Sequence, residues 1–154
     1  MTAKAKKTNE LISNARECAA MKTCMAARGL TRFYDDALKP VGLKVTQFSL
    51  LATIEQGQPK SISQLAQWLS IERTTLTRNL SLLENKGLVR LGPEGVRRAR
   101  SMTVTVKGER ILNRAMPLWQ EAQQRVTSKL GDTEWDNTKI VLDQLSNVAV
   151  ELGS

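Results

Sequence analysis

Residues 69–110 read LSIERTTLTRNLSLLENKGLVRLGPEGVRRARSMTVTVKGER, and this stretch decides the fold of the chain. Its first part predicts an amphipathic helix over residues 72–85, because leucines recur there at the i, i+4, i+7 spacing of one helix face. Those leucines are Leu76, Leu80 and Leu83. Gly87 stands directly after the helix, where glycine commonly ends one.

A second, shorter helix is predicted immediately before this one. Ser61 stands three residues before Gln64, the spacing of a capping box at a helix start. Two helices joined by a tight turn form a helix-turn-helix. After residue 87 the pattern changes to strand alternation, with strands expected over 88–91 and 101–106 and Met102, Val104 and Val106 on one side. The middle of the chain therefore predicts a helix-turn-helix followed by a hairpin wing.

Helical patterns occupy both ends of the chain. One long helix is expected over residues 9–38, ended by Pro40, and another over 45–55. After the hairpin two more are expected, the second with Asp132 as its N-cap. The predicted fold class is thus mainly α with a small β-hairpin wing.

The composition favours a polyanionic partner and disfavours an enzyme. The 154 residues carry a net charge of +8, with no histidine and two cysteines. A basic chain suits nucleic acid, whereas the commonest general base and metal ligand are missing. We expect no catalytic residues, metal or cofactor. We find no signal-peptide or membrane-spanning pattern, which together with sparse cysteine favours the cytoplasm.

The helix from Glu72 turns a short-chained polar face away from Leu76. Small hydroxyl side chains allow close approach to a DNA major groove, and an arginine can donate two hydrogen bonds to guanine. The alternative is an ordinary solvated helix face. The predicted major-groove residues are Arg73, Thr74, Thr75, Thr77, Arg78 and Ser81.

The hairpin region is strongly basic. From residue 86 to 107 it holds six cations (Lys86, Arg90, Arg97, Arg98, Arg100 and Lys107) against the single acid Glu94. Arginines at a wing tip can enter the minor groove, and others can neutralise phosphates. The predicted wing and backbone contacts are Ser61, Lys86, Arg90, Arg97, Arg98 and Arg100.

With these elements in order, the chain resembles the MarR family of winged-helix regulators from about Leu11 to Leu152. The specific parts are TTLTRNLSLLENKGLV (74–89), RRAR (97–100) and VTVKG (104–108). The family wing usually carries an aspartate two residues before its minor-groove arginine. Here Val96 stands at that position, which leaves the orientation of Arg98 less determined.

The resemblance implies a homodimer on a pseudo-palindromic operator in double-stranded DNA. It divides the chain into a flexible basic arm (1–8), a dimerisation region (9–40 and 107–152) and a winged helix-turn-helix (41–106). Most members are repressors released by a small phenolic or lipophilic ligand, and some by cysteine oxidation. Arg28, Arg32 and Tyr34 lie where the family places its effector pocket, although interface packing and ion pairs are the favoured interpretation of these three.

Cys18 and Cys24 are the two thiols on which a redox response would depend. Six residues apart on one helix, their Cα atoms would be about 10 Å apart, too far for a disulfide between them. An inter-subunit bridge or a sulfenate is open to them, but burial as two small apolar side chains is the favoured interpretation.

A constitutive architectural or RNA-binding module is the competing hypothesis for the basic surface. Single-strand and RNA readers generally stack bases on aromatic side chains. Aromatic residues make up 4% of this chain. The sequence therefore favours an operator-binding regulator.

Overall fold

Helices make up most of the described structure, with one short two-stranded hairpin, which confirms the predicted fold class. The computed structural model describes residues 17–93 and 101–153. In chain order the elements are α2 (Ala19–Leu38), the 3-10 turn η1 (Lys39–Val41), α3 (Val45–Gly57), α4 (Ile62–Trp68), α5 (Arg73–Asn85), β1 (Val89–Leu91), β2 (Met102–Val104), α6 (Val106–Leu130) and α7 (Asp132–Leu152). No helix in the described ranges is long and apolar enough to cross a membrane.

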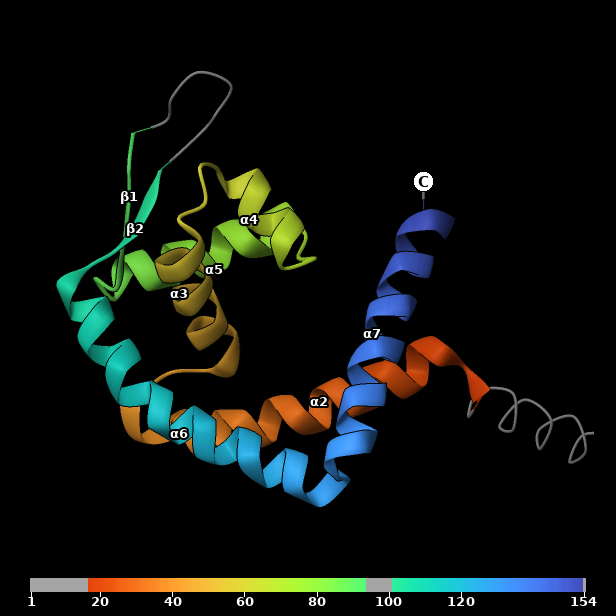
Figure 1. Cartoon of the computed structure of the whole chain (residues 1–154). Helices are drawn as coiled ribbons and strands as arrows, with labels where there is room; N and C mark the ends of the chain where they lie inside the picture. Colours follow the sequence, from red (N-terminus) through yellow and green to blue (C-terminus); the bar gives the residue numbers. More distant parts are fainter. Residues whose placement is uncertain (1–16, 94–100, 154) are drawn as a thin grey trace, which may run out of the picture.

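A lobe and a projecting helix are held by a common base (Figure 1). Helices α2 and α6 pack against each other and form this base. At one end of it α3, α4, α5 and the hairpin make up the lobe, while α7 leaves the other end and stands apart from the lobe in the view of Figure 1.

The lobe is built on a leucine-rich core. Leu76, Leu80 and Leu83 form the predicted stripe on α5, and each is 0% exposed. Burying a leucine side chain contributes roughly 1.5–3 kcal/mol, so this stripe fixes which face of α5 looks inward. Its partners in the core include Leu50, Leu51, Ile54, Leu65, Leu88 and Val89.

The helix ends in the lobe largely follow the sequence signals. Gly87 has φ +69 after α5, and the N–H of Leu88 donates to the carbonyl of Leu83, which completes a Schellman cap. Ser61 Oγ accepts from the N–H of Gln64, as the capping box predicts. The reciprocal bond differs, because Gln64 Oε1 accepts from the N–H of Lys60.

Several predicted boundaries were wrong by a few residues. Asp132 is the first residue of α7, and Gly131 is the N-cap. Val106 belongs to α6 and is 61% exposed, because the second strand ends at Val104. Cys18 precedes α2 as an extended N-cap, and residues 9–16 of the predicted first helix lie outside the described ranges.

Gly108 lets the start of α6 approach the base of the hairpin. A Cβ on this residue would lie 2.2 Å from the Leu88 carbonyl oxygen and 2.6 Å from Val104 Cγ1. We therefore expect Gly108→Ala to destabilise the fold by about 1–3 kcal/mol, despite the better helix propensity of alanine. Denaturant unfolding followed by circular dichroism at fixed protein concentration measures this change.

Gly29 provides the matched control, because it also lies inside a helix but a Cβ there meets nothing within 4 Å. Gly29→Ala should leave stability unchanged or raise it by up to about 1 kcal/mol. If both variants were stabilised alike, the close approach at Gly108 would be ruled out.

Candidate nucleic-acid interface

The outward face of α5 carries the residues predicted to enter a major groove. All six of them are exposed: Arg73, Thr74, Thr75, Thr77, Arg78 and Ser81. Helix α4 leads into α5 through a tight turn in which Ser70 has φ +49. The two helices pack against each other, so the predicted helix-turn-helix is present. Figure 1 places the hairpin beside α5.

Two of the hydroxyl groups on this face, those of Thr77 and Ser81, donate to carbonyls of the same helix. Thr77 Oγ1 donates to the carbonyl of Arg73 at 2.8 Å, and Ser81 Oγ donates to the carbonyl of Thr77 at 3.0 Å. Their oxygens keep lone pairs that can accept, and threonine adds a methyl group suited to thymine. Arg78 is left as the strongest donor in the middle of the face, with the fork that guanine requires.

The wing is only partly within the described structure. Strands β1 and β2 are antiparallel, and Arg90 pairs with Thr103. Both of these residues are exposed while Val89 and Met102 are buried, so Arg90 points away from the core. Residues 94–100, which include Val96, Arg97, Arg98 and Arg100, lie outside the described ranges. Minor-groove contact by the wing tip therefore stays a prediction.

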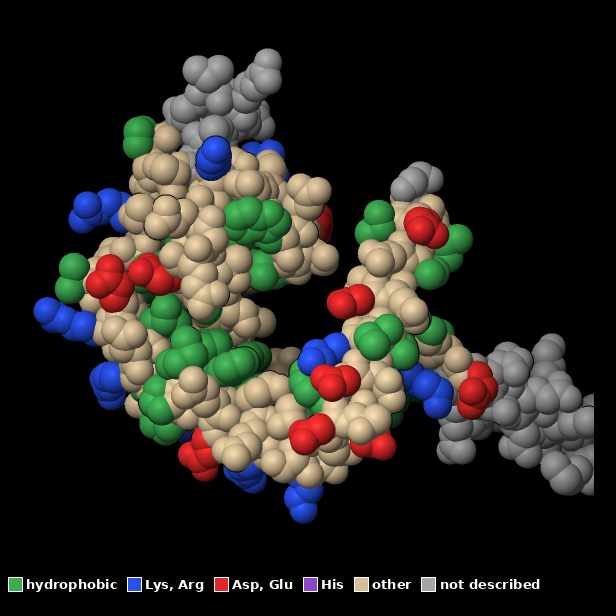
Figure 2. All heavy atoms as spheres, viewed as in Figure 1, with side chains coloured by type: hydrophobic (Ala, Val, Ile, Leu, Met, Phe, Trp, Pro, Cys, Tyr) green, Lys and Arg blue, Asp and Glu red, His purple; other side chains and the backbone are tan. Residues whose placement is uncertain are grey.

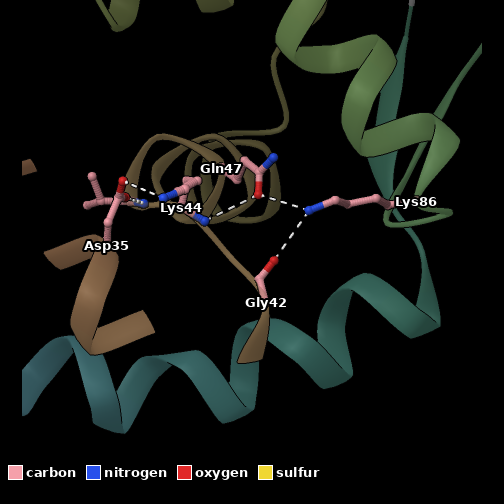
Figure 3. A network of polar contacts seen from close by, with 6 residues as sticks. Asp35, Gly42, Lys44, Gln47 and Lys86 are labelled. Carbon is pink, nitrogen blue, oxygen red and sulfur yellow. Dashed lines mark hydrogen bonds and ion pairs between the residues drawn. The ribbon is translucent and has the colours of Figure 1, made fainter. Parts of the chain in front are cut away.

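Two of the residues predicted to contact the DNA backbone form hydrogen bonds within the protein. The hydroxyl of Ser61 is engaged as the α4 cap. The ammonium of Lys86 donates to the Gly42 carbonyl at 3.3 Å and to Gln47 Oε1 at 3.2 Å (Figure 3). The sequence analysis did not predict that Gln47 is the partner of Lys86. The only sequence feature that could have indicated it is a polar residue among the apolar residues of α3.

A groove of about 1400 Å³ lies between α2, α6 and α7, away from α5. Its walls are largely apolar and include Leu30, Phe33, Trp135 and Leu142, with Arg125 over the Phe33 ring at 5.1 Å. The predicted effector residues Arg28, Arg32 and Tyr34 are not among the described residues that line it. Tyr34 instead donates to Gln123 Oε1 on α6, and burial raises the pKa of its phenol.

Both cysteines are exposed in the structure of the single chain. The favoured interpretation, that they are buried apolar side chains, is therefore wrong for the single chain. Among the tryptophans, Trp119 on α6 stacks on Phe48 of the core with ring centroids 5.6 Å apart. Trp68 at the end of α4 is 47% exposed.

Comparison with known proteins places this arrangement in one family. A family model described as MarR family matches residues 41–99. The chain is also 29% identical over 120 residues to the HTH-type transcriptional regulator PecS of Dickeya dadantii (strain 3937), over 75% of this chain and 72% of PecS.

Solved structures extend the similarity to most of the chain. The transcriptional regulator MosR of M. tuberculosis in complex with DNA has a TM-score of 0.79 and 40% identity, over 87% of this chain and 97% of that chain. A mutant MarR of E. coli complexed with operator DNA has a TM-score of 0.74 over 89% of this chain and 96% of that chain, and at 24% identity it supports the fold. Together with the helix-turn-helix and hairpin described above, these similarities establish that the chain belongs to the MarR family of winged helix-turn-helix transcriptional regulators.

Proposed function

We propose that the chain is a homodimeric repressor that reads a pseudo-palindromic operator, and that a small-molecule ligand or cysteine oxidation releases it. The observation that carries the proposal is the outward face of α5, whose six predicted contact residues are all exposed around Arg78. Helix α5 would enter the major groove and specify sequence, while wing cations including Arg90 would contact the backbone.

The proposal of a homodimer rests on α7. Every residue of this helix is described and none is buried. Its apolar stripe consists of Val141, Leu142, Leu145, Val148 and Leu152, each between 36% and 84% exposed. Monomers rarely expose contiguous apolar patches of this kind, which usually mark protein interfaces. Several separate hydrophobic side chains, coloured green, are visible along α7 in the space-filling view (Figure 2).

A second copy of the chain is the occupant that we propose for this apolar surface. The groove between α2, α6 and α7 adjoins it, because Leu142 lines the groove as well. Met21 and Met25 on α2 are exposed at 44% and 61%. This agrees with the proposed division into a winged domain at 41–106 and dimerisation segments at 9–40 and 107–152.

The two proposed release signals use different parts of the chain. Exposed thiols at Cys18 and Cys24 can reach an oxidant, which a sulfenate or inter-subunit bridge requires. A lipophilic ligand would need an apolar pocket with a few polar groups. In the dimer such a pocket would lie near Arg28, Arg32 and Tyr34 at the end of α2 that adjoins the lobe.

Binding of the purified protein to the DNA upstream of its own gene tests the proposal, with scrambled duplex as competitor and salt held fixed. We expect preferential binding to the upstream DNA. Equal affinity for both duplexes would instead support a constitutive architectural or RNA-binding module. Repeating the assay after peroxide treatment, with Cys18→Ser and Cys24→Ser variants, separates the signals. Loss of binding that needs a cysteine indicates redox release, and indifference to peroxide directs the search to ligands.

A further inference from the structure

We infer that Lys86 is a positioning residue, which ties the end of the recognition helix α5 to α3 and α2, and that it does not bind a DNA phosphate. The inference rests on the proposed operator binding and names a residue on which the placement of α5 in the groove depends. Its basis is a chain of polar contacts that runs from α2 through the start of α3 to the end of α5 (Figure 3).

Lys86 is the C-cap of α5, directly before the turn into β1. Its ammonium donates to the Gly42 carbonyl at 3.3 Å and to Gln47 Oε1 at 3.2 Å. Figure 3 shows the side chain extended toward these two acceptors. An ammonium has three donors, and two of them are directed at the protein in this arrangement. Lys86 as a residue is exposed, so it is the direction of its ammonium toward these two acceptors that distinguishes it from a free surface cation.

The contact between Lys86 and Gln47 matters because the amide of Gln47 is largely buried. The residue is 9% exposed, and its Oε1 accepts from the N–H of Lys44 at 3.2 Å as well as from Lys86. Both lone pairs of the amide oxygen are thereby used. If Lys86 turned away toward DNA, a largely buried acceptor would lose one partner, and such a loss is unfavourable.

The network continues from α3 into α2. Lys44 Nζ lies 3.1 Å from Asp35 Oδ2, and Asp35 Oδ1 accepts from the N–H of Val45 at 2.8 Å. Asp35 thus holds the first turn of α3, from which Gln47 reaches Lys86. Because α2 belongs to the proposed dimerisation region, this path links that region to α5.

On its other side Lys86 is joined to the base of the hairpin. Lys107 Nζ donates to the Lys86 carbonyl at 2.7 Å, and Thr105 Oγ1 donates to the Gly87 carbonyl at 2.7 Å. The end of α5, the start of α6 and the first turn of α3 therefore meet at one residue. A change here would alter the angle of α5 without removing any group from its outward face.

Salt dependence of binding distinguishes the two roles. A phosphate contact contributes about 0.9 to the slope of log affinity against log salt, so its loss lowers the slope by about one per subunit. A positioning residue contributes nothing to that slope. We would measure operator and scrambled-duplex affinities over a salt series for wild type, Lys86→Met, Gln47→Leu and the double variant. Arg90→Met removes a cation from an exposed strand position for comparison.

We expect Lys86→Met and Gln47→Leu each to weaken operator binding about tenfold at fixed salt, with the salt slope and scrambled-duplex affinity unchanged. The double variant should lose less than the sum of the two single losses, because both substitutions break the Lys86–Gln47 contact. Each also removes one contact of its own, to the Gly42 carbonyl or to the Lys44 N–H. Gln47→Glu keeps an acceptor for Lys86 and should retain wild-type operator affinity. Circular dichroism melting checks that each variant folds.

A lower salt slope for Lys86→Met, combined with wild-type operator affinity for Gln47→Leu, would overturn the inference and make Lys86 a phosphate contact. Additive losses in the double variant would also overturn it. Failure of the proposed function looks different, because wild type itself would then bind operator and scrambled duplex equally.

Discussion

Replacing Leu142 with aspartate should separate the proposed homodimer into monomers and weaken operator binding by about a hundredfold or more. Leu142 is 45% exposed in the single chain and lines the apolar groove beside α7. In a dimer interface a carboxylate at this position would lose its hydration without gaining a partner, which is costly. Each monomer would then engage one half-site, and the avidity of two linked recognition helices would be lost.

Asn147→Asp is the matched control, since it adds the same charge to the same helix. Asn147 is exposed and lies about 140° around α7 from Leu142, away from the apolar stripe. Sedimentation or light scattering gives the mass of each variant, and titration with operator duplex gives its affinity. Dimers of Leu142→Asp with wild-type operator affinity would show that this part of α7 is not the interface.

The lobe could be predicted from sequence because its signals are local. The leucine stripe of α5 and the αL position at Gly87 depend on spacing and on one residue's backbone freedom, and both were confirmed. The Ser61 cap was confirmed for the same reason. Short polar side chains opposite the stripe had to face solvent once the stripe was buried. The exposed face around Arg78 was therefore predictable together with the helix.

What sequence reasoning missed depends on contacts between distant residues. The contact of Lys86 with Gln47 is one of these, because nothing near Lys86 in sequence predicts that an amide oxygen 39 residues away accepts a hydrogen bond from its ammonium. Tyr34 likewise has its partner Gln123 on another helix, 89 residues away. Cys18 was expected to be buried, but it is exposed in the single chain. Helical spacing shows which residues share a face, and whether that face is buried depends on the element that covers it.

Arg78 is the residue whose loss should most reduce the discrimination between operator and other DNA. It is exposed in the middle of the outward face of α5. A bidentate contact to guanine contributes about 1–3 kcal/mol of discrimination, and a dimer would lose two of them. We therefore expect Arg78→Ala to reduce operator affinity by about a hundredfold or more. Scrambled duplex should lose only the smaller contribution of one charge per subunit.

Arg78→Lys separates base reading from charge at the same position. Lysine keeps the positive charge but lacks the planar fork that donates two parallel hydrogen bonds. If Arg78 reads a base, Arg78→Lys should bind scrambled duplex with the wild-type affinity and salt slope while it loses most of the preference for operator. If Arg78 contacts a phosphate, Arg78→Lys should keep full operator affinity and Arg78→Ala should weaken both duplexes equally. Sequence reading by α5 would then have to rest on the hydroxyl residues around Arg78, whose protons are already donated to the helix at Thr77 and Ser81.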